Sequence, residues 1–163
     1  MRKYLLHVLI ISFIFLLTPT AQVATYAGES QNELIESCRE AVRESPDYFI
    51  AHYALGGAYH GAGRFEEAIR SFKMSIKLNP DFASAYTFLG LSFGANSKPK
   101  EAMMCYQKAI SIDPDDALAH YGLGVVYLHP YLNDIDSALK QYKILKKLDT
   151  GKANQLFNYI YKE

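Results

Sequence analysis

One spacing constrains this chain more than any other feature: a set of residues returns every 34 positions. Pro46, Pro80 and Pro114 keep this step, each is followed at once by aspartate, and a Leu-Gly pair recurs at the same interval, starting at Leu55. A repeat of this length is typical of a helix-turn-helix unit, which cannot bury its apolar face alone and must stack on its neighbours. The spacing therefore predicts an all-α array of paired helices.

Apolar residues recur at helical intervals between the prolines. We expect helices over 31–44, 50–62, 65–78, 84–95, 99–112, 118–128 and 135–148, and one short helix within 151–163. Ser30 and Glu33 have the spacing of a capping box that begins the first helix. Each proline ends the helix before it, and the aspartate after it can cap the helix that follows.

The chain divides into six segments on this reading. They are an N-terminal apolar segment (1–27), a single half-unit helix (28–46), three helix pairs (47–82, 83–116 and 117–150) and a C-terminal capping helix (151–163). The third pair carries an insertion at 129–133, which we expect to shorten the preceding helix and to form a protruding loop.

Recurring small and large residues predict how the helices pack. Glycine inside a helix costs about 1 kcal/mol relative to alanine, so its return at the same step indicates close approach of paired helices. We expect close contacts between paired helices at Gly56, Gly90, Gly124, Ala68, Ala102 and Ala138. Phe72, Tyr106 and Tyr142 should fill the space between units. The terminal helices should bury Leu34, Ile35, Cys38, Ala41 and Val42, and Leu156, Phe157 and Ile160.

The combined pattern resembles the tetratricopeptide repeat. Leu55, Gly56, Tyr59, Ala68, Phe72 and Pro80 form the motif, which returns 34 residues later. The resemblance implies a right-handed α-solenoid whose first helices line a concave groove that binds protein segments. By repeat position, the candidate groove residues are Tyr53, His60, Thr87, Leu91, Tyr121, Val125 and Leu128. The chaperone-binding members hold a C-terminal carboxylate with lysine, asparagine and arginine there, so this groove should take an apolar extended or helical segment instead.

The N-terminus has the layout of a secretory signal. Arg2 and Lys3 precede an apolar run over 4–17, and small residues follow it up to Ala27, before Gly28. A positive start, an apolar stretch and a small-residue cleavage site together favour a cleaved signal. The alternative is an uncleaved membrane anchor, because 4–28 is long enough to span a bilayer.

Charge and residue usage argue against other functions. The formal net charge is +0 for the chain, and −2 once 1–27 is removed, so nothing favours nucleic-acid binding. Cys38 and Cys105 form no CxxC pair and are expected to be buried hydrophobes. His52 and His120 occupy equivalent positions without a second ligand four residues away, so we expect no metal site. No catalytic or phosphate-binding motif occurs, and we expect neither an enzyme nor a cofactor.

We therefore expect an exported interaction module, periplasmic or secreted, that binds a protein or peptide partner. The alternative is a membrane-anchored scaffold that self-associates into a homo-oligomer through the exposed end of its lone N-terminal helix. Lys140, Lys143, Lys146 and Lys147 line the last long helix, either as a solvated outer face or as a contact with an anionic membrane.

Overall fold

The computed structural model describes residues 19–130 and 132–161, with side chains described from Ser30 onward. The helices in these ranges are α2 (Pro19–Glu44), α3 (Phe49–Gly61), α4 (Phe65–Leu78), α5 (Ala83–Ala95), α6 (Pro99–Ile112), α7 (Ala117–Tyr127), α8 (Ile135–Leu148) and α9 (Thr150–Ile160). All regular structure in these ranges is helical. The structure thus confirms the all-α prediction.

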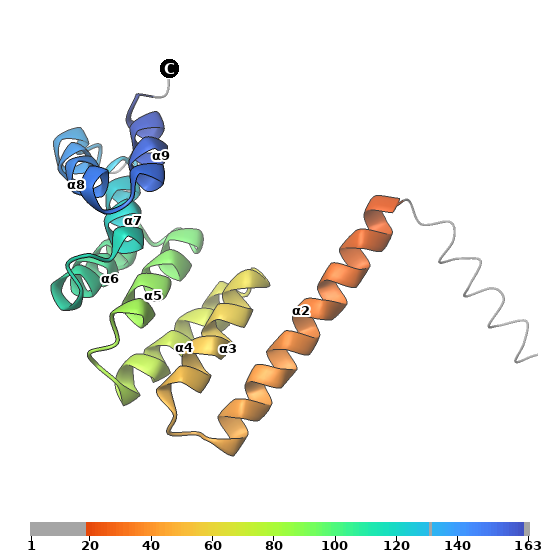
Figure 1. Ribbon diagram of the computed structural model, residues 1–163. Coiled ribbons are helices and arrows are strands. Elements are labelled where there is room, and N and C mark those ends of the chain that lie inside the picture. The colour runs from red at the N-terminus through yellow and green to blue at the C-terminus, as the bar shows by residue number, and fades with distance from the viewer. Residues whose placement is uncertain (1–18, 131, 162–163) are drawn as a thin grey trace, which may run out of the picture.

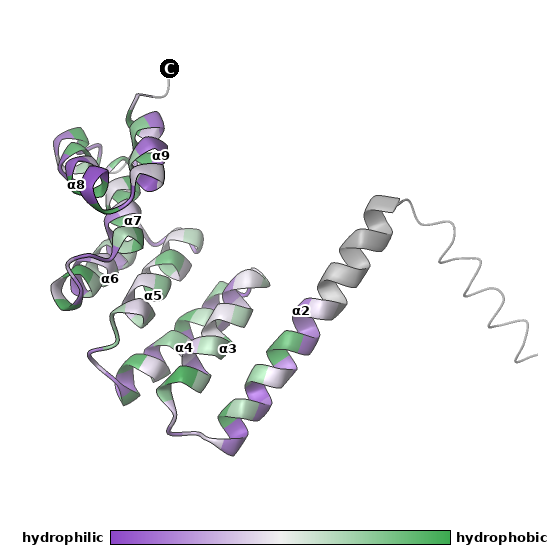
Figure 2. Ribbon diagram, viewed as in Figure 1, coloured by the Kyte–Doolittle hydropathy of each residue, from purple (hydrophilic) through white to green (hydrophobic). Residues whose placement is uncertain are grey.

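The helices stack in chain order into a curved array (Figure 1). α3 packs on α4, α5 on α6 and α7 on α8, and each pair also contacts the next one along the chain. α2 covers one end of the array and α9 the other, where α9 contacts both α7 and α8. Apolar residues lie mainly between the helices (Figure 2). The result is an α-solenoid with one continuous core that runs from α2 through the first two pairs to α7, and a second, smaller core under α9.

Helix boundaries follow the predicted ones closely after α2. The second helix of each pair matches the prediction residue for residue, and α3, α5 and α7 each begin one residue earlier than expected. α7 has 11 residues where α3 and α5 have 13, as the insertion predicts. The turn within each pair passes through a left-handed residue at the equivalent position: Gly63, Ser97 (φ 57°) and Asn133 (φ 46°). Glycine adopts this conformation without strain, whereas serine and asparagine do so at a cost.

α2 differs most from its prediction. It begins at Pro19, so Ser30 lies inside the helix and the expected capping box is wrong. Ile35 is buried and Cys38 and Val42 are half-buried, but Leu34 is 54% exposed and Ala41 is also exposed. α2 packs mainly on α3, and a single neighbouring helix covers a narrower stripe than two would.

Arg39 of α2 and Arg64, in the turn between α3 and α4, both contact the buried ring of Tyr59 in α3. The Arg39 Nε donates a hydrogen bond to the Tyr59 hydroxyl, with 2.9 Å between the two atoms. The Arg64 guanidinium lies 4.7 Å from the centre of the same ring. Cation–π contact with a buried ring stabilises such a junction.

The aspartate after each proline does not cap the next helix. Tyr48 and Phe82 occupy the cap positions of α3 and α5 without a side-chain hydrogen bond. At α7 the cap is Asp116, whose carboxylate accepts from the backbone N–H groups of Leu118 and Ala119. In the third unit the predicted cap was Asp115, and the residue that caps α7 is the next one, Asp116.

Aromatic rings, not facing backbones, explain the repeated glycines. A Cβ atom added at Gly56 would lie 2.7 Å from the Phe72 ring, and one at Gly90 would lie 2.7 Å from the Tyr106 ring. In the third unit the equivalent contact changes: a Cβ at Gly124 would lie 2.5 Å from Leu156 of α9. α9 thereby takes the place predicted for Tyr142, which is half-buried beside Phe157. The alanines of the second helices, Ala68, Ala102 and Ala138, are fully buried as predicted.

The N-terminal signal or anchor falls partly outside the described residues, which begin at Pro19. Among the helices that are described, none combines the length and apolar composition that crossing a membrane requires.

Candidate functional site

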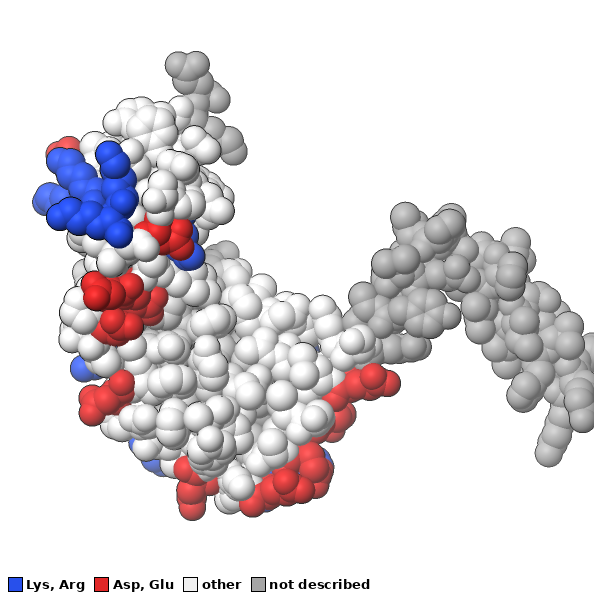
Figure 3. All heavy atoms as spheres, in the orientation of Figure 1, with Lys and Arg blue, Asp and Glu red and all other residues white. Residues whose placement is uncertain are grey.

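The concave side of the array is an uncharged hollow. Figure 3 shows the inward-facing surface between the two ends of the array in white, while lysine, arginine, aspartate and glutamate gather along its outer edge and ends. The first helices of the pairs supply this surface because their partners pack behind them. A surface with these properties favours apolar ligands over ionic ones.

One cavity of the hollow lies between the C-terminal end of α5, the length of α7, and α9. It encloses ≈ 530 Å³, and its wall includes Leu91, Gly94, Pro99, Tyr106, Tyr121, Gly122, Val125, Leu128, His129 and Tyr159. No lysine, arginine, aspartate or glutamate lines it. Four of the seven predicted groove residues, Leu91, Tyr121, Val125 and Leu128, therefore meet in one cavity.

Two tyrosines connect this cavity to a second hollow. Tyr121 of α7 and Tyr159 of α9 line both cavities, and Gln155 and Asn158 complete the second one, of ≈ 570 Å³. Tyr159 is 54% exposed, while Tyr121 is half-buried. Burial, and to a smaller extent the neighbouring Tyr159, raises the pKa of Tyr121, so its hydroxyl stays neutral and can donate a hydrogen bond. The pair presents broad apolar rings with polar tips, as in many binding surfaces.

Tyr53 lies in a different environment from Tyr121. Its ring packs against Phe82 at 5.0 Å, Phe88 at 5.6 Å and Phe72 at 5.8 Å, between the first and second pairs. Burial raises its pKa, and the charge of Asp116 adds to this. Tyr53 is not among the residues that line the cavity with Leu91 and Tyr121. The aromatic cluster indicates that it joins neighbouring units.

Thr87 and His60 also take part in packing between units. Thr87 is 1% exposed, and its hydroxyl donates to the Asp116 carboxylate at 2.5 Å, so it cannot contact a ligand in the groove. His60 is half-buried, with Nδ1 3.0 Å from the Ser92 hydroxyl oxygen, and burial lowers its pKa. His60 therefore faces the second unit more than open solvent.

Tyr159 and Gly122 belong to the site although repeat position did not predict them. The sequence pattern assigned Phe157 to the buried face of the last helix, but Phe157 is 42% exposed, and the fully buried residues of that helix are Ala153 and Leu156. Once Leu156 faces α7, helical spacing places Tyr159 one turn further along the same side. Gly122 was missed because its two equivalents, Ala54 and Phe88, share no residue type with it.

His52 and His120 have the structural role that their repeated position suggests. In each, Nε2 lies within hydrogen-bond distance of the proline carbonyl six residues earlier, 2.7 Å from Pro46 and 2.9 Å from Pro114. His120 also contacts the Gln141 side chain at 2.7 Å. The histidines thus join the turn between units to the helix that follows.

Metal binding and nucleophilic chemistry would depend on the histidine, cysteine and carboxylate side chains. Over the described residues, no group of histidine, cysteine, aspartate and glutamate side chains is arranged to hold a metal ion. Cys38 and Cys105 are not paired with each other, and burial raises the pKa of Cys105 to about 11. A thiol with a raised pKa is a poor nucleophile at neutral pH.

Comparison with known proteins bears on the fold and on the family. A family model described as TPR repeat matches residues 98–129, and one described as Tetratricopeptide repeat matches 49–82. The crystal structure of MamA is 30% identical, with a TM-score of 0.67 over 82% of this chain and 78% of that one. No curated protein sequence matches the chain.

Two less similar solved structures share the fold. A thermophilic TPR protein of Thermus thermophilus is 22% identical, with a TM-score of 0.68 over 81% of this chain and 74% of that one. The first TPR domain of Spaghetti (RPAP3), solved with a bound HSP90 peptide, is 17% identical, with a TM-score of 0.65 over 71% of this chain and 91% of that one. With the MamA match and the repeat models, they make the class clear. The chain belongs to the tetratricopeptide repeat proteins.

Proposed function

We propose that this chain is a non-enzymatic adaptor that binds an uncharged, apolar segment of a partner protein between α5, α7 and α9. One observation carries the proposal: the ≈ 530 Å³ cavity there has no charged residue in its wall. Leu91, Val125 and Leu128 supply apolar surface, and Tyr121 and Tyr159 add rings with hydroxyl groups at their edges. Aromatic anchors of this kind dominate the binding energy of many interfaces.

The cavity wall also indicates what the partner segment is not. The neighbouring RPAP3 domain is described as bound to an HSP90 peptide, but a carboxylate needs a cation at its binding site. This cavity has no lysine or arginine in its wall, so we infer an internal segment of the partner, extended or helical, with large apolar side chains. The tyrosine hydroxyls can then bond to its backbone.

We further propose that the protein acts outside the cytoplasm, because the sequence over 1–27 has the layout of a cleaved export signal. Intact-mass measurement on native material tests this. A mature chain that begins near Gly28 and needs no detergent supports export, whereas an unprocessed chain in the membrane fraction supports the anchor.

A second arrangement, a self-associating scaffold, has one observation in its favour. α2 packs mainly on α3 and leaves Leu34 54% exposed, next to the buried Ile35. An unpartnered apolar residue on a terminal helix can join a second copy. Analytical ultracentrifugation of the wild type and Leu34→Gln tests it, and equal masses at all concentrations would reject it.

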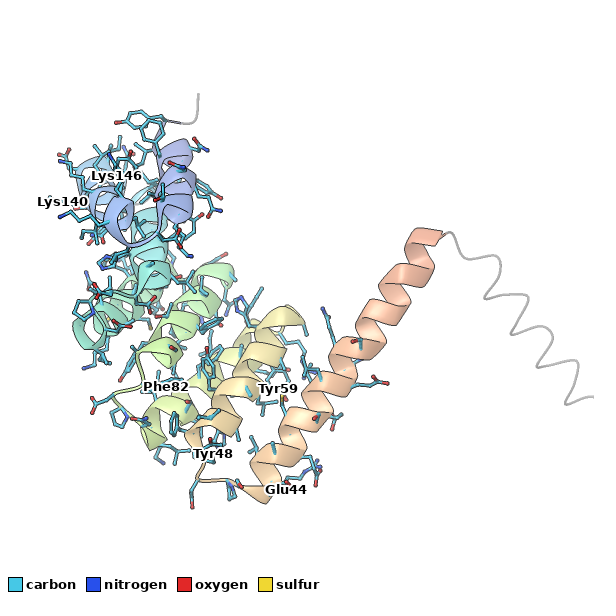
Figure 4. The ribbon with its side chains drawn as sticks, viewed as in Figure 1. Glu44, Tyr48, Tyr59, Phe82, Lys140 and Lys146 are labelled. Carbon is cyan, nitrogen blue, oxygen red and sulfur yellow. The ribbon has the colours of Figure 1, made fainter. Side chains whose placement is uncertain are left out.

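A paired measurement tests the groove proposal. The wild type and Tyr121→Ala are used to isolate the partner from native cells, and its affinity for each is then measured. Tyr121→Ala should cost about 2 kcal/mol or more of binding free energy if it is an anchor, with little change in melting temperature. Tyr48→Ala is the matched control, because Tyr48 is 51% exposed and lies at the other end of the array (Figure 4). A large fall in melting temperature with unchanged affinity would place Tyr121 in the core and reject its role in binding.

A further inference from the structure

A stripe of lysines runs along the outer face of α8. Lys140, Lys143 and Lys147 are all exposed, and at about 100° per residue they project within about 60° of one another. Ala138 and Leu145, both fully buried, project from the opposite side of the helix. The lysines therefore point directly away from the array, and Figure 3 shows them as one blue patch over α8.

The lysines of this patch outnumber the carboxylates close to them, and no ion pair among the described residues neutralises them. None of the ion pairs in the described part of the chain includes Lys140, Lys143, Lys146 or Lys147. Two carboxylates lie beside the patch: Asp136 is on the same face of α8, and Asp134, whose pKa is lowered first by its hydrogen bonds with Ser137, also interacts with the charge of Lys140. Asp149 at the end of the helix is paired with Lys152. From residue 135 onward six lysines stand against three acidic residues, whereas 28–134 has nine basic and fourteen acidic residues. The chain is thus polarised, with its positive end at α8.

Exposed apolar side chains border the lysines on both sides. Ile144, 37% exposed, lies within α8 beside Lys140 and Lys147. On the other flank Phe157 of α9 and Tyr161, which follows that helix, are 42% and 55% exposed, and their rings lie 4.5 Å apart. Phe157 also contacts Tyr142, over whose ring the Lys146 ammonium lies at 5.9 Å. Lysines mixed with aromatic and aliphatic side chains are typical of surfaces that lie at a lipid–water interface.

We propose that the α8 face is a membrane-contact surface that binds anionic lipid headgroups. The lysine ammonium groups would contact the phosphates, while Ile144, Phe157 and Tyr161 enter the headgroup layer. Figure 4 shows Lys140 and Lys146 pointing outward from α8, on the side away from the concave hollow. A protein bound this way keeps the cavity between α5, α7 and α9 open to a partner, so the proposal adds to the groove function and does not depend on it.

A second copy of the chain fits this surface less well than a membrane does. Two of its acidic residues on α2 are already engaged, since Glu36 pairs with Arg39 at 2.7 Å and Glu40 with Arg43 at 2.6 Å. An acidic protein surface would also leave the exposed Phe157 and Tyr161 rings without an apolar counterpart. A lipid interface satisfies both the charges and the rings.

Vesicle co-sedimentation of the full-length protein tests the proposal. One set of vesicles contains phosphatidylglycerol mixed into phosphatidylcholine, and the other is phosphatidylcholine alone. The measured quantity is the ratio of the two partition coefficients, because any contribution of an apolar N-terminal segment is common to both vesicles. The triple variant Lys140→Gln, Lys143→Gln and Lys147→Gln should lower this ratio roughly 100-fold, at about fivefold per lysine. High salt, about 500 mM, should lower the wild-type ratio in the same direction.

A matched triple variant, Lys77→Gln, Lys98→Gln and Lys108→Gln, removes the same charge from exposed lysines elsewhere. It should keep the ratio within about threefold of the wild type, since charges beyond a screening length act weakly. Equal losses in the two triples would overturn the proposal, because net charge would then explain the binding. It would also be overturned if the α8 triple left the vesicle ratio unchanged and abolished salt-sensitive self-association in the ultracentrifuge, which would assign the surface to a second copy.

Discussion

Replacing Gly122 with alanine tests how the second and third units pack against each other. The Tyr106 ring, 3% exposed, lies between the backbones of α5 and α7. A Cβ atom at Gly122 would lie 2.6 Å from the Tyr106 Cε1 atom, and one at Gly90 would lie 2.7 Å from the same atom. The ring has no space to retreat, because one glycine contacts it from each side.

The size of the effect follows from two opposing contributions. Forcing an extra carbon into a filled core costs about 1–3 kcal/mol, while alanine in place of glycine inside a helix recovers about 1 kcal/mol. We expect Gly122→Ala to lower the free energy of unfolding by about 1 kcal/mol. Gly57→Ala is the control, since no atom lies within 4 Å of a Cβ placed there, and it should raise the free energy of unfolding by about 0.5–1 kcal/mol.

Urea denaturation of the two variants measures this difference, which amounts to about 2 kcal/mol, or about 6–8 °C in melting temperature. Tyr106→Leu should remove most of the penalty of Gly122→Ala in a double-mutant cycle, because the smaller side chain vacates the contact. If Gly122→Ala stabilises the protein as much as Gly57→Ala, Tyr106 does not fill the space between α5 and α7 and the packing described above is wrong.

Three further predictions concern stability. Ala102→Leu should lower the free energy of unfolding by about 1–3 kcal/mol through overpacking, because Ala102 is fully buried. Lys108→Ala, at an exposed position, should change it by no more than about 0.5 kcal/mol. Equal urea midpoints of the two variants would contradict the repeat register. Ser97→Gly should stabilise by about 0.5–1 kcal/mol, because Ser97 holds φ at 57°, and a calorimetric melting temperature at or below that of the wild type would contradict this. Burial lowers the pKa of His60 below its ordinary 6.5, so its contribution to the free energy of unfolding is complete above about pH 6.5 and is lost as the pH falls below that value. His60→Gln should make the free energy of unfolding fall less steeply with decreasing pH in a series of urea melts. An unchanged slope would contradict the burial of the neutral ring.

The sequence predicted the array because its constraints recur. Each unit must present a small residue where a large ring crosses, and must break its helices at the same place, so Gly56 and Gly90, or Pro80 and Pro114, repeat as a set. Packing contacts that recur in every unit can therefore be predicted from the spacing of residues in the sequence. The second helices of all three pairs were predicted without error for this reason.

The wrong predictions of which side chains a helix buries lie where an element has no equivalent in the repeat. α2 packs mainly on one helix, so its buried stripe is narrower than the apolar spacing suggests and excludes Leu34 and Ala41. α9 has no following helix, and its contact with Gly124 through Leu156 turns Phe157 outward and Tyr159 toward the groove. Nothing in the spacing predicts which side of a terminal helix meets the array.

Four of the seven groove residues predicted from the sequence line the cavity. Position within the repeat identified Leu91, Tyr121, Val125 and Leu128, because the first helices face inward in every unit. It could not show that Thr87 bonds to Asp116, or that Tyr53 enters a cluster with Phe72, Phe82 and Phe88. Those contacts depend on side chains from neighbouring units, which differ from one unit to the next.

Site-specific photo-crosslinking in native cells tests the groove most directly. A benzophenone amino acid replaces Tyr159, which is 54% exposed in the cavity wall, or Met104, which is 66% exposed on α6 and lines no part of that cavity. Substitution at two exposed positions leaves the core intact, so the two proteins should fold and melt alike. If the partner binds between α5, α7 and α9, irradiation yields a discrete adduct from position 159 and little from position 104. Adducts from position 104 alone, or equal yields from both positions, would show that the partner binds elsewhere and would contradict the account.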